Sequence, residues 1–103
     1  MNNLEQEQQQ LLTVENEYWV KMWEDLQGLK NDPRFKRLIL EGYFKDKAVN
    51  GVSMLAADYT IANGKRSEIM EELISISRLE DFFITVENLG SAAESALSEE
   101  TEE

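Results

Sequence analysis

Residues 67–89 read SEIMEELISISRLEDFFITVENL, and this stretch decides the fold. Its apolar side chains recur at helical spacing along one stripe, namely Ile69, Leu73, Ile76, Phe83 and Val86. Ser67 suits an N-cap, and the acidic residues that follow it match the positive end of a helix dipole. Gly90 is a residue type that commonly ends a helix. The pattern therefore predicts an amphipathic helix from Ser67 to about Leu89, with a further turn or two over 91–97.

The segment from Leu4 to Lys30 is also predicted to be helical. Leu12, Trp19 and Leu26 recur every seven residues, although Glu15 interrupts the companion series of Met22 and Leu29. Residues 1–8 carry little apolar surface, so they are expected to fray or to need a partner.

The central segment opens at Asp32-Pro33, where an aspartate N-cap precedes a proline at the first helical position. Gly42 and the charged residues 45–47 indicate a break or kink within 42–47, after which helical spacing resumes as far as Tyr59. This segment is one kinked helix or two short ones. Asn63-Gly64 is typical of a turn, since both residues tolerate positive φ.

These segments together predict an all-α protein: a small helical bundle with a long N-terminal amphipathic helix, a kinked central helix and a C-terminal helix. The chain has 103 residues, the length of one domain. We expect a single helical domain over residues 1–97. Residues 98–103 contain four glutamates and no apolar side chain, and they are predicted to form a disordered acidic tail.

The composition argues against several functions. The chain has 21 acidic and 10 basic residues, a formal net charge of −11, which disfavours direct binding to nucleic acid or to an anionic membrane surface. No apolar run approaches the roughly 18 residues of a membrane span, and residues 1–10 lack the pattern of a signal peptide. A soluble cytoplasmic protein is therefore expected.

Catalytic and metal-binding patterns are weak. The chain has no Cys and no His, so thiol chemistry, structural zinc sites and His-based triads are excluded. Glu68 and Glu72 share a helix face at a spacing that could chelate a hard cation, but acids at a helix start are usually partners of the dipole. No phosphate-binding glycine motif is present. We expect no enzymatic activity, no catalytic residue, no cofactor and no metal.

Positive charge is concentrated between residues 30 and 47, which hold six basic and three acidic residues. One interpretation is a basic protein-docking patch on an otherwise acidic chain. The other, which the composition favours, is a solvated helix face neutralised by acids of the third helix. A homotypic contact between unlike patches lies between the two. The candidate docking residues are Arg34, Lys36, Arg37, Lys45 and Lys47.

The first helix supplies a second candidate surface, made of Trp19, Met22, Trp23 and Leu26. Trp19 and Trp23 lie one helical turn apart, and tryptophan is enriched where a partner buries it. The alternative is ordinary packing within the chain, and the sequence leaves both interpretations open.

One region resembles a known group of proteins. Residues 34–59 read RFKRLILEGYFKDKAVNGVSMLAADY, and Ile76-Ser-Arg-Leu79 followed by Phe82 continues the pattern. Over residues 34–89 the chain resembles small acidic helical accessory proteins of tailed bacteriophages. Residues 59–66 depart from the pattern, because they replace a proline-containing linker. The resemblance implies a virion-assembly role, in the host cytoplasm or in the virion, and carries over no catalytic residue.

The resulting expectation is a non-enzymatic protein-binding factor, a homo-oligomer that serves as a phage virion-assembly or virion-structural accessory protein. Its partner would be a phage structural protein or a host protein. The alternative is a phage-encoded inhibitor of a host enzyme or defence factor, which acts by occlusion or as an acidic mimic of nucleic acid.

Overall fold

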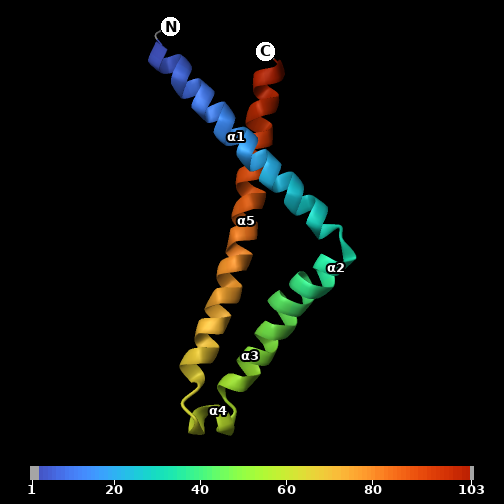
Figure 1. The fold of residues 1–103 in the computed structure, drawn as a ribbon, viewed down its shortest axis with the longest axis vertical. Coiled ribbons are helices and arrows are strands. Elements are labelled where there is room, and N and C mark those ends of the chain that lie inside the picture. The colour runs from blue at the N-terminus through green and yellow to red at the C-terminus, as the bar shows by residue number, and fades with distance from the viewer. Residues whose placement is uncertain (1–2, 103) are drawn as a thin grey trace. The chain divides into compact units, whose positions relative to one another are not determined.

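The computed structural model describes residues 3–102, with backbone alone for residues 101 and 102. The described chain contains helices and turns but no strand, which confirms the all-α prediction (Figure 1). The helices are α1 (Asn3–Lys30), α2 (Pro33–Phe35), the π-helix η1 (Lys36–Asp46), α3 (Lys47–Leu55), α4 (Asp58–Ala62) and α5 (Arg66–Glu102).

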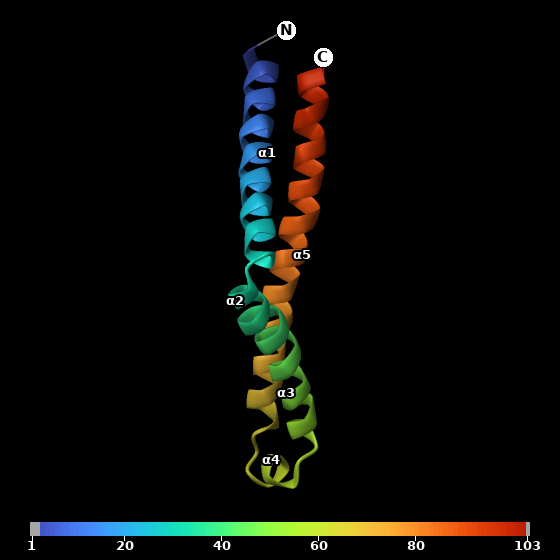
Figure 2. The ribbon, with the colours of Figure 1, turned by 90° about the vertical axis from the view of Figure 1, so that its right-hand side faces the viewer.

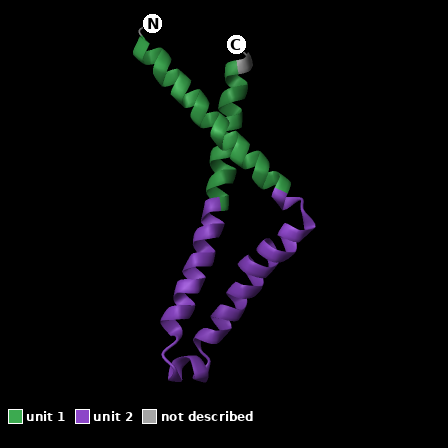
Figure 3. Cartoon of the chain, in the orientation of Figure 1, with its two compact units in different colours: residues 1–28, 83–103 green, residues 29–82 purple. Residues whose placement is uncertain are grey.

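The chain divides into two compact units, whereas the sequence predicts a single domain over residues 1–97 (Figure 3). Unit 1 comprises residues 1–28 and 83–103, and unit 2 comprises residues 29–82. In unit 1, α1 runs antiparallel beside the C-terminal part of α5 (Figure 2). Unit 2 pairs η1 and α3 with the N-terminal part of α5, and α4 lies at the turn between them.

Unit 1 packs around Gly90. Leu26, Val86 and Ala93 are buried, and so is Gly90 itself. A Cβ atom at position 90 would overlap the Cβ of Trp23 and lie 2.7 Å from its Cγ. The prediction that α5 ends at Gly90 is therefore wrong, because this glycine lies inside the helix and permits a close approach of α1.

α5 also continues through residues 98–102, where the sequence predicts a disordered acidic tail; Glu103 lies outside the described residues. Gln9 Nε2 donates a hydrogen bond to Glu100 Oε1 at 2.7 Å, which ties this last part of α5 to α1. At the other terminus, α1 begins at Asn3, and the side chains of residues 3–12 are all exposed. Residues 1 and 2, part of the segment expected to fray, are outside the described range.

The central helix of unit 2 begins as the sequence predicts. Asp32 is the N-cap of α2, and its Oδ1 accepts a hydrogen bond from the Arg34 backbone N–H at 2.9 Å, with Pro33 next in the chain. Hydrogen bonds from the Arg34 side chain and backbone hold the pKa of the Asp32 carboxyl below its usual value.

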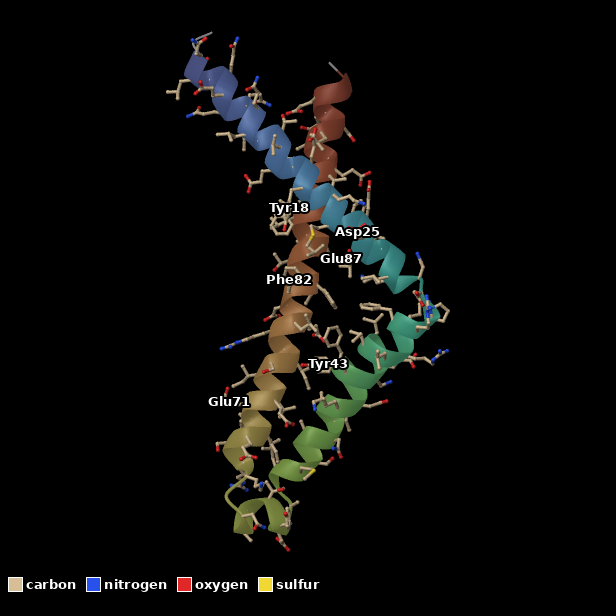
Figure 4. The ribbon with its side chains drawn as sticks, viewed as in Figure 1. Tyr18, Asp25, Tyr43, Glu71, Phe82 and Glu87 are labelled. Atoms are coloured by element: carbon tan, nitrogen blue, oxygen red, sulfur yellow. The ribbon has the colours of Figure 1, made fainter. Side chains whose placement is uncertain are left out.

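A π-helix, η1, occupies the region where the sequence predicts a break or kink. The backbone stays helical through Gly42, and the Lys47 N–H donates to the Gly42 carbonyl five residues earlier. Long π-helical stretches are rare, since most are single turns inserted in α-helices. Within η1 the half-buried apolar residues form doublets at 39–40 and 43–44. Tyr43 lies between η1 and α5 (Figure 4).

The turn of unit 2 follows the sequence prediction at Gly64, which adopts a φ of 63°. The sequence predicts Ser67 as the N-cap of α5, but the helix already begins at Arg66. Ser67 therefore lies in the first turn of α5 instead of before it. Arg66 Nε donates to the Leu55 carbonyl oxygen at 2.9 Å and so closes the end of α3 onto the start of α5.

Candidate protein-binding surfaces

The tryptophan face of α1 is used within unit 1. Leu26 is 4% exposed, while Trp19, Met22 and Trp23 are half-buried. The indole N–H of Trp23 donates to Glu87 Oε2 at 3.3 Å, and Gln27 Nε2 donates to Glu87 Oε1 at 2.8 Å. Figure 4 shows Glu87 on α5 near α1. This geometry favours the intramolecular interpretation of the face, and a role for it in partner binding stays a prediction.

A different face of α1 is exposed and apolar. We call it the α1 stripe, made of Leu4, Leu11, Val14 and Tyr18, whose exposed fractions are 61%, 69%, 63% and 55%. Three of them recur every seven residues and Val14 takes an intermediate position, which is the spacing of a helix-packing seam. The Tyr18 ring stands edge-on to Trp19, with centroids 5.1 Å apart (Figure 4).

From the sequence, Leu11 and Tyr18 only widen the apolar face of this helix, and the series singled out is the adjacent one through Leu12, Trp19 and Leu26. Both series repeat every seven residues, and they differ in register by one position. Periodicity alone does not say which of two adjacent series faces the neighbouring helix. No local signal chooses between them, because the contact of Gly90 with Trp23 is known only once α1 and α5 are placed together.

The basic candidates have different environments, all within unit 2. Arg34 pairs with Asp32 at 2.9 Å, and Lys47 lies 3.8 Å from Glu72 of α5. Lys36, Arg37 and Lys45 are exposed and have no ion-pair partner among the described residues. Neutralisation by acids of the third helix, the interpretation that the composition favours, is thus seen for Lys47 but not for these three.

We call Lys36, Arg37 and Lys45 the basic surface, and the exposed acids Glu41 and Asp46 lie in the same stretch of the chain. Leu38 is 71% exposed although it is a large apolar side chain, but it lies two residues after Lys36 and therefore on another side of the helix. Further along the same helical segment, Val49 and Val52 are 62% and 61% exposed.

Unit 1 carries the whole net negative charge of the chain. Unit 1 contains twelve acidic residues and one basic residue, Lys21, whereas unit 2 contains nine of each. Lys21 is itself paired with Asp25 at 3.2 Å. The two units therefore present very different electrostatic surfaces to any partner.

Unit 2 also contains a small cavity of about 200 Å³ among α3, α4 and the start of α5. Thr60 lines it and is fully buried, and its hydroxyl has no hydrogen-bond partner in the described part of the chain. The acidic residues predicted as a weak cation pair, Glu68 and Glu72, line the same cavity but face Lys65 and Lys47. Within residues 3–102, no group of three potential metal ligands is found.

Replacing Thr60 by valine is expected to raise the free energy of unfolding by about 1 kcal/mol. The substitution keeps the side-chain volume and removes a buried hydroxyl that has no partner. Thr60→Ser, which keeps the hydroxyl and removes the methyl group, should instead lower it by about 1 kcal/mol. Urea denaturation followed by circular dichroism measures both, and a valine variant less stable than the serine variant would contradict this account of the cavity.

Comparison of the chain with protein-family models, curated proteins and solved structures gave no match. None of the described helices combines the length and the apolar character needed to cross a lipid bilayer. The surfaces themselves are therefore the basis for a functional proposal.

Proposed function

We propose that the chain is a non-enzymatic protein-binding factor whose contact surface is the α1 stripe. The observation that supports this most strongly is the exposure of four large apolar side chains at the spacing of a helix-packing seam. Their exposed fractions, 55% to 69%, are high for side chains that gain free energy when water is excluded. A second protein that covers them supplies that gain.

The particular role we propose is that of a virion-assembly or virion-structural accessory protein of a tailed bacteriophage, acting as a homo-oligomer. This rests on the resemblance of residues 34–89 to such proteins. Within that range lie the basic surface and the residues of η1, which supply charge for orienting a partner. The expected location is the host cytoplasm or the virion.

Affinity capture of the tagged full chain from infected cells tests this role. A capsid, portal or tail protein should co-purify, and the double variant Leu11→Ser/Tyr18→Ser should reduce its recovery by about tenfold or more. Glu24→Ser/Glu94→Ser changes two exposed residues away from the α1 stripe, one on α1 and one on α5, and should leave recovery unchanged. Capture of no particle protein, together with normal particle formation when the chain is deleted, would contradict the proposal.

The alternative function is inhibition of a host enzyme or defence factor, and the charge of unit 1 is the observation that favours it. Twelve acidic residues against one lysine resemble the charge density that a nucleic-acid-binding protein recognises. In the same capture experiment this alternative predicts a host protein that nucleic acid displaces from the chain. It also predicts that particles form without the chain.

A further inference from the structure

The α1 stripe is part of a regular seven-residue pattern that also contains two charged residues. Three exposed apolar residues share the first position of the repeat, namely Leu4, Leu11 and Tyr18. The fourth position of the repeat holds Val14 at the centre, with Glu7 one repeat before it and Lys21 one repeat after it, and both charged side chains are exposed. The stripe therefore has an apolar centre, an acid toward its N-terminal end and a cation toward its C-terminal end.

The helix α5 leaves this pattern uncovered. Trp23, which meets Gly90 of α5, lies on a neighbouring face of α1. Along residues 3–12 every side chain of α1 is exposed, and the hydrogen bond from Gln9 to Glu100 of α5 is a polar contact. The whole pattern over residues 4–21 lies in unit 1, so a contact made through it needs no contribution from unit 2.

We propose that the α1 stripe packs antiparallel against the α1 stripe of a second copy of this chain, with the centre of the contact between residues 12 and 13. In an antiparallel helix pair, a first-position residue of one helix faces a fourth-position residue of the other. With this centre, Leu11 of each copy meets Val14 of the other copy. The contact is made by the same residues of both copies, and it therefore closes as a two-fold symmetric pair.

This alignment brings opposite charges near each other and keeps like charges apart. Tyr18 faces Glu7 of the second copy, whose carboxylate accepts a hydrogen bond from the phenol O–H. Leu4 faces Lys21 of the second copy, whose aliphatic stem covers the leucine while its ammonium group stays in water. Glu7 and the second copy's Lys21 are then about 4.5 Å apart along the helix axis, the rise of three residues.

The polar residues beside the stripe are also compatible with this alignment. Glu15 faces Gln8 of the second copy on one side of the contact, and Glu17 faces Gln10 on the other side; all four side chains are exposed. A glutamine amide donates hydrogen bonds to a carboxylate, whereas two carboxylates at these places would repel each other.

A parallel pair of stripes is disfavoured by the same charges. It would place each residue opposite its own equivalent, so that Glu7 would face Glu7 and Lys21 would face Lys21. Like charges that face each other oppose association. The order of charges along the stripe therefore selects the antiparallel orientation.

The remaining acids of unit 1 predict how salt acts on the pair. Each copy of unit 1 has twelve acidic residues and one lysine, so two copies repel each other at long range. Added salt screens this repulsion but leaves the apolar contact in place. Self-association should therefore strengthen as salt is added, and weaker association at high salt would contradict the proposed contact.

Cysteine cross-linking tests the orientation, because the chain has no cysteine of its own. Leu4→Cys and Lys21→Cys are prepared as separate variants, mixed in equal amounts and oxidised. Residues 4 and 21 of one helix are about 25 Å apart, whereas the Cα atoms of a disulfide lie within about 7 Å of each other. Only the antiparallel pair brings residue 4 of one copy to residue 21 of the other. Mass spectrometry should therefore find the mixed disulfide dimer in about tenfold excess over the two homodimers together.

The matched control pairs Leu4→Cys with Glu94→Cys, an exposed position on α5 of the same unit. Random collision forms as much mixed dimer as both homodimers together, and this is the result expected for the control. The same random proportions in the mixture of Leu4→Cys and Lys21→Cys would overturn the proposal. An excess of homodimers would also overturn it, because that result indicates a parallel pair.

A charge variant tests the alignment independently. Gln8→Lys/Gln10→Lys places cations opposite Glu15 and Glu17 of the second copy, and should strengthen self-association about tenfold in sedimentation equilibrium. Its control is Asn88→Lys/Ser95→Lys, which makes the same change in net charge at two exposed positions of α5 and should have a smaller effect. Equal effects of the two variants would overturn the alignment, because net charge alone would then explain them.

This inference rests on the proposed protein-binding function, and the two can fail separately. A chain that remains monomeric yet captures a particle protein through Leu11 and Tyr18 keeps the proposed function and loses the antiparallel pair. A chain that pairs antiparallel but captures no particle protein keeps the pair and loses the virion role.

Discussion

The Gly90→Ala variant should unfold about 2–3 kcal/mol more easily than the wild type, although alanine is intrinsically the better helix former. The added methyl group would overlap the Cβ of Trp23 and lie 3.0 Å from the carbonyl oxygen of Trp19. Since one of these is backbone and the other is the root of a large side chain, α1 and α5 must move apart to admit it. Denaturant unfolding followed by circular dichroism measures the change.

Gly28→Ala is the matched control, because a Cβ at position 28 of α1 meets no atom within 4 Å. Here alanine should raise the free energy of unfolding by up to about 1 kcal/mol through helix propensity alone. Equal effects of the two substitutions would show that α1 does not approach α5 at Gly90.

The second large effect is expected at Trp23. Trp23→Ala removes the ring that packs on Gly90 and the donor to Glu87, and should lower the free energy of unfolding by about 3 kcal/mol. Tyr18→Ala, which truncates an aromatic ring that is 55% exposed, should change it by no more than about 0.5 kcal/mol. Tyr18→Ala should nevertheless weaken association by about tenfold or more.

Thermal melting and sedimentation of the two variants distinguish packing from binding. If Trp23→Ala weakened association and left the melting temperature unchanged, the tryptophan face would be the binding surface and the α1 stripe would not. A large loss of stability in Tyr18→Ala would likewise contradict the assignment of Tyr18 to an exposed surface.

The sequence predicted the helices well where local chemistry determines them. The Asp32-Pro33 start and the Gly64 turn depend on neighbouring residues alone, and the structure places both where they were expected. Gly90 was misinterpreted because the same residue type ends helices and admits close helix contacts. Only the tertiary partner, Trp23, distinguishes these two uses.

Local sequence patterns did not predict the π-helix or the continuation of α5 beyond Gly90. A kink and a widened turn both disturb 3.6-residue spacing near Gly42, and the doublets at 39–40 and 43–44, which are four residues apart, fit an α-helix as well as the wider turn. Residues 98–102 lack apolar side chains, so a prediction based on burial leaves them out of the helix, whereas the contact of Glu100 with Gln9 is a polar one.

The sequence predicted that α1 and residues 30–47 carry candidate surfaces. It did not predict which side chains of each are exposed. Composition located the basic residues, yet it could not tell that Lys47 meets Glu72 while Lys36 and Lys45 have no such partner. Heptad spacing indicated a seam on α1, and the structure shows two adjacent series: one is covered by α5 from Trp19 to Leu26 but has Leu12 53% exposed, and the other, the α1 stripe, is exposed throughout.

Sedimentation equilibrium of the wild-type chain over micromolar concentrations, at low and high salt, tests the central claim most directly. A protein that exposes the apolar α1 stripe and acts as a homo-oligomer should show a mass above the 11.9 kDa of one chain. A mass of 11.9 kDa at every concentration and at both salt levels would contradict the account.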